Sequence, residues 1–327
     1  MKNIVPILLL VVVALGAYFV VQSVQQSANQ AQEVMQPLSD ANHAMQTQVS
    51  NLMNPTPTVI ADPVTIIHDI HALDNGNLLV QQGWQKVVEV EPTTGKVVWT
   101  YDATQRPENR GKKIEIHAFQ PLADGRVMIA ESGSGRIIEV DRAGVIQHEI
   151  ALKMNRPHAH RDTRLARKTA AGTYLVAHEG DGVCREYNAA GEVIWEYPVP
   201  MFGKSAKGGH GPEAFGNALF GVLRLPNGNT LIATGNGHRV LEVNPAKEIV
   251  WQLTPADVPE ITLAWLTTLE VLPNGNIVFG NCHAGPGQPL LVEVERPSKK
   301  VVLTFDEFKR FGNSAPNSVL VGAESLR

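Results

Sequence analysis

The sequence is poor in cysteine and has no large excess of either charge, and each shortage excludes a class of protein. Only Cys184 and Cys282 occur in 327 residues. They form no metal-binding motif, and they permit one disulfide without indicating a disulfide framework. The 28 basic and 32 acidic residues give a net charge of −4. No domain-wide basic excess is present, so we predict no nucleic-acid partner.

The segment from Ile4 to Val21 has no charged residue over 18 positions. A helix of this length nearly spans the hydrocarbon core of a bilayer. No small-x-small cleavage site ends the run, and Ser27-Ala28 is the best alternative for a cleaved signal peptide. Lys2 is the nearby basic residue and Lys86 the next along the chain. Residues 1–21 therefore predict a single-pass transmembrane helix that anchors the rest outside the cytoplasm, on the periplasmic side of the cell membrane.

Residues 22–55 are rich in Gln, Ser, Asn and Ala, and predict a polar helical stalk. Apolar and small residues recur there at steps of mostly four and three, which is a heptad pattern. Pro37 is expected to break or kink the helix. Two interpretations remain open, namely a coiled coil that joins copies of this chain or other subunits of a membrane complex, and a single helical spacer. Asn54-Pro55-Thr56-Pro57 marks the boundary of the next domain.

Residues 56–327 repeat one phrase of apolar runs separated by Asn-Gly-type turns. The turn glycines are spaced 49, 47, 56 and 47 residues apart and are Gly76, Gly125, Gly172, Gly228 and Gly275. Four short strands in each period are typical of a β-propeller. Five complete units leave residues at both ends of the domain. Pro316 to Val321 and Thr58 to Ile60 then predict a sixth blade built from both termini, with a seven-bladed ring as the alternative.

The third and fourth strands of the units carry a phrase that ends on Gly-x-Val-Val-Trp or a close variant. It occurs at residues 89–99, 186–195 and 242–251. This phrase resembles the repeat of quinoprotein-like (PQQ-like) propellers and of the related arylsulfotransferase-like propellers. The resemblance implies that Trp99, Trp195 and Trp251 dock neighbouring blades. Quinoprotein dehydrogenases have eight blades and often adjacent cysteines, which this chain lacks, so we do not expect bound PQQ.

The candidate functional residues lie where the innermost strand of each blade begins. His68, His117 and His160 stand five residues before Leu73, Leu122 and Leu165, whereas blades four and five carry Phe220 and Thr267 at this position. The third match requires that Leu165 is the equivalent leucine. Imidazoles that converge at one channel mouth would suit a divalent transition metal, which makes His68, His117 and His160 a candidate metal site.

Polar residues that follow each turn glycine at a near-constant distance are expected at the same mouth. They are Gln82, Glu131, His178, Thr234 and Asn281, with Glu179 adjacent. We predict ligand contacts from Glu131, His178, Glu179 and Arg161. The resemblance to arylsulfotransferase-like propellers implies a channel histidine that carries a sulfuryl group. By position this would be His117 or His160, with Arg161 or Arg164 as anion contact.

Two functions remain open from the sequence. The first is a binding or scaffold subunit of a membrane-associated assembly, with a His- and Glu-lined mouth that takes a metal or a small anion. The second is an arylsulfotransferase-like or metal-dependent enzyme that uses a channel histidine. A Gly-rich insertion at residues 201–217 contains Gly203-Lys204-Ser205 but lacks the rest of a phosphate loop, so we expect no nucleotide binding.

Overall fold

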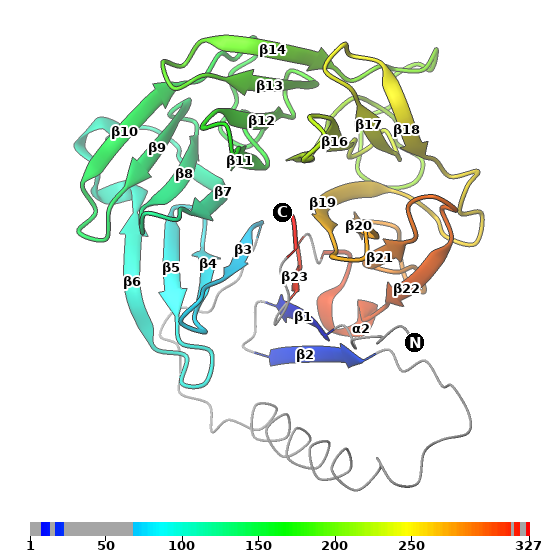
Figure 1. Cartoon of the computed structure of the whole chain (residues 1–327), viewed down its shortest axis with the longest axis horizontal. Helices are drawn as coiled ribbons and strands as arrows, with labels where there is room; N and C mark the ends of the chain where they lie inside the picture. The colour runs from blue at the N-terminus through cyan, green and yellow to red at the C-terminus, as the bar shows by residue number, and fades with distance from the viewer. Residues whose placement is uncertain (1–7, 14–16, 23–67, 315–316, 321–324) are drawn as a thin grey trace, which may run out of the picture.

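The computed structural model describes residues 8–13, 17–22, 68–314, 317–320 and 325–327. Within these residues the chain forms an all-β propeller, with five four-stranded sheets arranged in chain order around a centre (Figure 1). Every sheet is antiparallel, and its strands pair in sequence order. The first strand of each blade is innermost, so the starts of five strands approach one another near the centre.

The elements have the following bounds. Blade one contains β3 (Ile70–Ala72), β4 (Leu78–Gln82), β5 (Lys86–Val90) and β6 (Val97–Asp102), followed by the short 3-10 helices η1 (Ala103–Gln105) and η2 (Pro107–Asn109). Blade two contains β7 (Glu115–Pro121), β8 (Val127–Ser132), β9 (Arg136–Val140) and β10 (Ile146–Ala151). Blade three contains β11 (Ala166–Lys168), β12 (Tyr174–His178), β13 (Val183–Tyr187) and β14 (Val193–Pro198). Blade four contains β15 (Gly221–Arg224), β16 (Thr230–Ala233), β17 (Val240–Val243) and β18 (Ile249–Leu253). Blade five contains β19 (Trp265–Val271), β20 (Ile277–Cys282), β21 (Leu291–Val294) and β22 (Val301–Phe305), followed by α2 (Phe308–Phe311).

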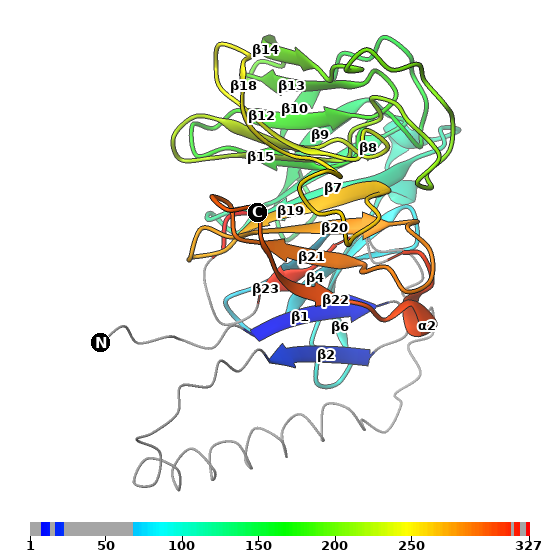
Figure 2. The ribbon, with the colours of Figure 1, turned by 90° about the vertical axis from the view of Figure 1, so that its right-hand side faces the viewer.

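The prediction of six blades, with seven as the alternative, is wrong, because the described residues form five. A three-stranded sheet of order β2-β1-β23 stands between blades five and one (Figures 1 and 2). It joins β1 (Leu8–Val13) and β2 (Ala17–Gln22) to β23 (Val319–Leu320). Both ends of the chain thus contribute strands here, whereas Thr58 to Ile60 lies outside the described residues.

The predicted N-terminal transmembrane helix is not observed. Its described parts, Leu8–Val13 and Ala17–Gln22, are antiparallel strands. Their composition explains this outcome, since a run dominated by Val and aromatic residues also has a high strand propensity. None of the helices in the described parts of the chain is long and apolar enough to cross a bilayer. Most of the predicted stalk, residues 23–55, lies outside the described residues.

The five first turns share one backbone geometry. The turn glycines Gly76, Gly125, Gly172, Gly228 and Gly275 have φ between 80° and 86°. The N–H of each glycine donates to the carbonyl oxygen of the residue three positions earlier, at 2.8–2.9 Å. A positive φ is accessible to glycine without steric cost, so the repeated glycine follows from the backbone of a tight hairpin.

Burial follows strand position within each blade. The second and third strands are buried on both faces because a neighbouring sheet covers each face, as in β8 and β9. The fourth strands alternate between exposed and more buried residues, as in β10 and β22. The contacts between neighbouring blades form separate apolar clusters, such as that joining Leu231 and Leu253 of blade four to Phe279 and Val292 of blade five. The core is therefore distributed around the ring rather than concentrated at its centre.

The outer tryptophans dock neighbouring blades, which confirms the expectation from the sequence. The indole N–H of Trp99 donates to the Arg142 carbonyl at 3.0 Å. Trp195 donates to Pro245 at 3.2 Å and Trp251 to Arg296 at 3.1 Å. In each case the acceptor belongs to the second turn of the next blade, so one bond repeats at three blade contacts.

A buried ion pair joins the inner ends of blades one and three. Arg167 donates to both oxygens of Asp69, from Nη1 at 2.7 Å and from Nη2 at 2.9 Å. Asp69 also accepts from the Phe119 N–H of blade two at 3.2 Å and from Asn317 Nδ2 at 3.0 Å. Burial opposes ionisation of Asp69, but Arg167 and His71 outweigh it and hold the pKa of this carboxyl below its usual value.

We predict that Asp69→Asn destabilises the ring strongly. The change leaves the Arg167 charge buried without its counter-charge, which typically costs about 3–5 kcal/mol. Urea unfolding monitored by tryptophan fluorescence measures the loss. Asp124→Asn is the matched control, since Asp124 forms an exposed pair with Arg126 in blade two. Equal unfolding midpoints for the two variants would show that the Asp69–Arg167 pair does not hold the blades together.

Candidate functional site

The first strands define five equivalent positions around the centre of the ring. In each blade the N–H of the turn glycine donates to the carbonyl oxygen of one residue. In blades one to five these residues are Leu73, Leu122, Thr169, Leu225 and Leu272. Blade three is therefore aligned on Thr169, and the assumption that Leu165 is the equivalent leucine is wrong. Five residues before these positions stand His68, His117, Arg164, Phe220 and Thr267. The third member of the ring is thus Arg164 and not His160.

His117 and Glu115 come from the same inner strand. In β7, Ile116 pairs with Glu131 and Ala118 with Ala130, so His117 is an extra residue in a β-bulge. Bulges often redirect side chains next to functional sites. The side chains of His117 and Glu115 are both buried.

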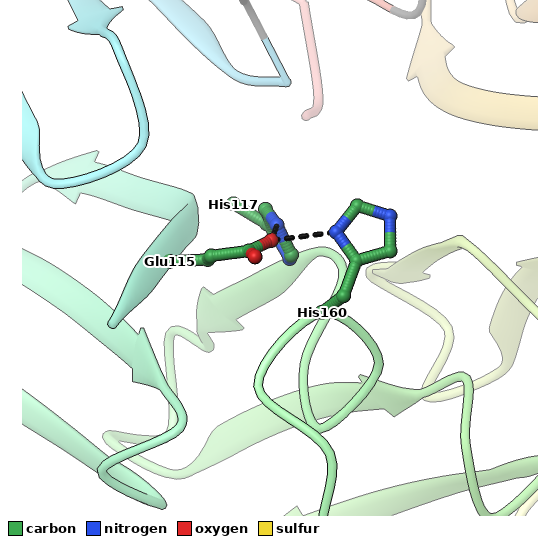
Figure 3. Close-up of side chains that lie close together, drawn as sticks. All are labelled: Glu115, His117 and His160. Atoms are coloured by element: carbon green, nitrogen blue, oxygen red, sulfur yellow. Dashed lines mark hydrogen bonds and ion pairs between the residues drawn. The ribbon is translucent and has the colours of Figure 1, made fainter. Parts of the chain in front are cut away.

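His160 reaches the same place from the loop between β10 and β11. The carboxylate of Asp162 shapes this loop, since Oδ1 accepts from the His158 N–H at 2.5 Å and Oδ2 accepts from the Gly133 N–H at 3.1 Å. The His160 side chain is 38% exposed. The loop therefore brings an accessible imidazole to the buried pair on β7 (Figure 3).

The three side chains converge on a single carboxylate oxygen. His160 Nδ1 donates to Glu115 Oε2 at 2.5 Å, and His117 Nε2 lies 3.1 Å from the same atom. One potential ligand atom from each residue lies within 4.8 Å of the others. The Lys113 ammonium lies 2.7 Å from the other oxygen, Oε1. We call these three residues the Glu115–His117–His160 cluster.

Aromatic side chains surround the cluster. The Trp84 ring lies 5.4 Å from the His160 ring and 5.8 Å from that of His117. His68 lies 4.7 Å from His117 and 6.2 Å from Phe220. The Arg164 guanidinium lies 5.4 Å from the centre of the Phe220 ring. Aromatic and imidazole rings therefore lie around the Glu115 carboxylate, with Arg164 close to Phe220.

The pKa values follow from this environment. Burial is the largest effect on His117 and lowers its pKa to about 4 despite the adjacent Glu115. Burial, His117 and Arg164 hold the pKa of His68 well below its usual value. Burial opposes ionisation of Glu115, but His117, Lys113 and His160 outweigh it and hold its pKa below the usual value. At neutral pH an ionised carboxylate therefore faces a neutral His117.

Comparison with known proteins identifies the repeat. Residues 37–302 match a PQQ-like family model described as "Outer membrane protein assembly factor BamB". The chain belongs to this PQQ-like family. No curated protein matches the chain.

The solved structures that resemble this PQQ-like chain share its fold, and their low sequence identity shows no more than that. A protein of unknown function from Bacteroides caccae is 21% identical, with a TM-score of 0.61, over 76% of this chain and 84% of that chain. Streptogramin B lyase is 13% identical, with a TM-score of 0.50, over 72% and 67%. A catalytically inactive virginiamycin B lyase from Staphylococcus aureus with quinupristin is 10% identical, with a TM-score of 0.51, over 74% and 71%.

Other residues that the sequence pointed to in this PQQ-like ring have structural partners. Glu131 accepts from Tyr101 at 2.5 Å and from Arg136 Nε at 2.6 Å. The buried side chains of Arg164 and Glu179 pair with each other. These contacts leave Glu131, Glu179 and Arg164 engaged with protein groups.

The remaining predicted positions lie away from the cluster's ligand atoms. His178 Nδ1 donates to the Asp162 carbonyl at 2.7 Å, and its Nε2 accepts from the Tyr187 hydroxyl at 2.8 Å. Arg161 is exposed, and its backbone orders the loop. Thr234 bonds to the backbone of Arg239 in its own loop. Asn281 bonds to backbone groups of Thr262 and Ala264 before β19 and of Pro289 before β21.

Sequence reasoning missed three residues of the mouth. Glu115 stands two residues before His117. Residues two apart in a strand lie on the same face of the sheet, so this spacing could have indicated Glu115 from the sequence. Trp84 and Gln81 follow the Gly76 turn. Gln81 Oε1 accepts from the His68 N–H at 3.0 Å and lies 3.2 Å from His68 Nδ1. His68 is thus held by blade one, and its ring packs on His117 rather than joining the convergent ligand atoms.

We predict that His178 makes the PQQ-like domain less stable in acid. Burial and then Arg185 lower its pKa to about 4, against the ordinary value of 6.5, while Asp181 and Glu196 oppose this shift. Between these values the unfolded chain binds a proton that the folded chain does not, so stability falls as the pH falls from 6.5 to 4.

Urea unfolding at several pH values between 7.5 and 4.5 measures this dependence. His178→Gln is expected to reduce the slope by up to about 1.4 kcal/mol per pH unit, the value for one proton. The exposed His158 provides the control substitution His158→Gln. An unchanged slope in His178→Gln would contradict the assignment.

Proposed function

We propose that this chain is a membrane-associated, extracytoplasmic binding subunit of an assembly that handles outer-membrane proteins. The family match over residues 37–302 carries this proposal, because the matching model is described as an outer membrane protein assembly factor. The fold supports it. A ring whose inner strands are tied by Asp69 and whose outer strands are tied by tryptophan bonds presents a stiff surface to partners.

The channel mouth is the binding surface that we propose for a small ligand, a metal or an anion. It gathers Glu115, His117 and His160 beside Trp84. His160 is accessible to solvent, whereas Glu115 and His117 are held in a buried strand. A fixed wall and one accessible ligand group are suited to taking up a small ligand from solution.

We propose that the apolar run Ile4 to Val21 directs the chain to the cell membrane. The absence of charge over 18 residues supports this role. Residues 22–54 are the proposed contact with other subunits or with a second copy of this chain. The pairing of β1 with β23 offers a separate role for the same run in closing the ring.

Deleting residues 1–21 separates these two roles. If the run targets the chain, the full-length protein sediments with membranes and is open to protease added to spheroplasts, whereas the deleted form stays soluble in the cytoplasm. If β1 also closes the ring, the deleted form unfolds at a lower temperature. A full-length chain that is soluble and protected from protease would refute the proposed location.

The assembly role predicts a defect when the gene is deleted in its own organism. Heat-modifiable outer-membrane β-barrel proteins are expected to decrease in quantity, because a scaffold subunit raises the local concentration of its partners. Crosslinking in intact cells should capture the chain on the membrane complex that inserts these proteins. Normal barrel levels together with no such crosslink would exclude the role.

A second function is supported by one observation, the bond between His160 Nδ1 and the Glu115 carboxylate at 2.5 Å. This bond leaves His160 Nε2 as the ring nitrogen with a lone pair, so His160 could act as a nucleophile. In an arylsulfotransferase-like reaction Nε2 would bond to sulfur as the S–O bond to the phenolate breaks, and Glu115 would stabilise the imidazolium. Arg164, which we predicted as the anion contact, is engaged with Glu179.

We predict that such an enzyme releases 4-nitrophenolate from 4-nitrophenyl sulfate in the presence of a phenol acceptor. His160→Ala is expected to abolish the release, and Glu115→Gln to reduce it by about 100-fold or more. Absorbance at the nitrophenolate band measures both effects. Absence of turnover in the unmodified protein would leave the binding role alone.

A further inference from the structure

In the Glu115–His117–His160 cluster, the position of the His117 ring fixes which of its nitrogens faces the carboxylate. His117 Nδ1 lies 2.8 Å from the Thr163 carbonyl oxygen, which can only accept a hydrogen bond. Nδ1 therefore carries a hydrogen, and Nε2 is the ring nitrogen that is directed at Glu115 Oε2, at 3.1 Å. A cation at this place would be bound by Nε2 and by the carboxylate oxygen together.

The surrounding contacts resemble the outer shell of a metal site. A histidine ligand usually donates its other ring N–H to a carbonyl or carboxylate, which fixes the ring and its tautomer. Thr163 has this relation to His117. Lys113 lies against Oε1 of Glu115 at 2.7 Å, and Oε2 is thereby turned towards the two imidazoles. Both buried groups are thus oriented by atoms outside the cluster.

The position of each ligand gives an entry path for an ion. Glu115 and His117 lie in the buried strand β7, while His160 comes from a loop and is 38% exposed (Figure 3). Ligand atoms on one Zn²⁺ ion are each about 2.0–2.2 Å from the metal. The 2.5 Å contact between His160 and Glu115 would therefore widen as the ion enters, and the loop position of His160 permits that movement. The ion would take the place of the hydrogen on His160 Nδ1, and the neutral ring would carry its hydrogen on Nε2 instead.

The donor set selects the class of ion. Two imidazole nitrogens and one carboxylate oxygen suit Zn²⁺, Fe²⁺, Co²⁺ or Ni²⁺, whereas Mg²⁺ and Ca²⁺ prefer oxygen ligands throughout. Three protein ligands also leave at least one coordination position for water or another molecule. Trp84 lies beside both imidazoles and would border that position.

We propose that Glu115 Oε2, His117 Nε2 and His160 Nδ1 bind one divalent transition-metal ion at the channel mouth. This inference rests on the proposed role of the mouth as a ligand-binding surface and names its ligand. It revises the metal set expected from the sequence, because Glu115 takes the place of His68. His68 instead packs on His117 at 4.7 Å and supports its ring from the side.

Calorimetric titration of the full chain with Zn²⁺ tests the site, and Co²⁺ absorption tests the ligand type. We expect one Zn²⁺ per chain and visible Co²⁺ bands typical of nitrogen and oxygen ligands. His160→Ala and Glu115→Gln should each weaken Zn²⁺ binding by about 100-fold or more, since loss of an outer-shell partner alone costs 10–100-fold. Neither change removes apolar core volume, and thermal unfolding confirms that the variants fold.

His148→Ala, in the outer strand β10, is the matched control. This variant should bind Zn²⁺ with the affinity of the unmodified chain.

Two results would overturn the proposal. One is no Zn²⁺ or Co²⁺ binding by the folded chain, and the other is equal affinity in His160→Ala, Glu115→Gln and His148→Ala. The assembly role has its own readout in barrel-protein levels and crosslinking, so it can fail or stand independently. A chain that binds no metal but still crosslinks to the membrane complex would refute the metal site alone.

Discussion

The contact on which the ring depends is the buried pair between Asp69 and Arg167. One carboxylate accepts from Arg167 of blade three, the Phe119 N–H of blade two and Asn317 near the end of the chain, while itself belonging to blade one. Four parts of the chain that are distant in sequence therefore share one charge. A buried ion pair gives little net stability compared with apolar packing, but loss of either partner leaves an unpaired charge. Its effect is to require one arrangement of the inner strands.

The same short segments that hold this pair also carry the candidate site. Asp69 follows His68, Phe119 lies two residues after His117, and Arg167 lies three residues after Arg164. Each segment contributes one group to the Asp69 contacts, namely the Asp69 carboxylate, the Phe119 N–H or the Arg167 guanidinium, and another side chain to the channel mouth. The positions of the mouth groups are consequently set by the contacts of Asp69, Phe119 and Arg167. This arrangement explains how a site can be rigid although its residues come from different blades.

The sequence predicted the repeat better than the site. Turn glycines and outer tryptophans recur because hairpin geometry and blade docking impose the same demand in each unit, and the structure bears both out. The blade number was wrong because a count of periods cannot show how incomplete ends are used. His160 was assigned to the ring through Leu165, but the hydrogen bonds align blade three on Thr169. His160 nevertheless reaches His117 from a loop, and the conformation of this loop cannot be predicted from the spacing of the repeats.

The site departs from the repeat in a way that bears on its role. Blades four and five place Phe220 and Thr267 at the positions that His68 and His117 hold in blades one and two. Docking between blades does not require imidazole there, because blades four and five pack against each other through an apolar cluster without it. Glu115 and His117 belong to blade two, and His160 belongs to the connection between blades two and three. An ion held by all three would therefore tie that connection to β7, and its binding would alter the mouth without altering the blades.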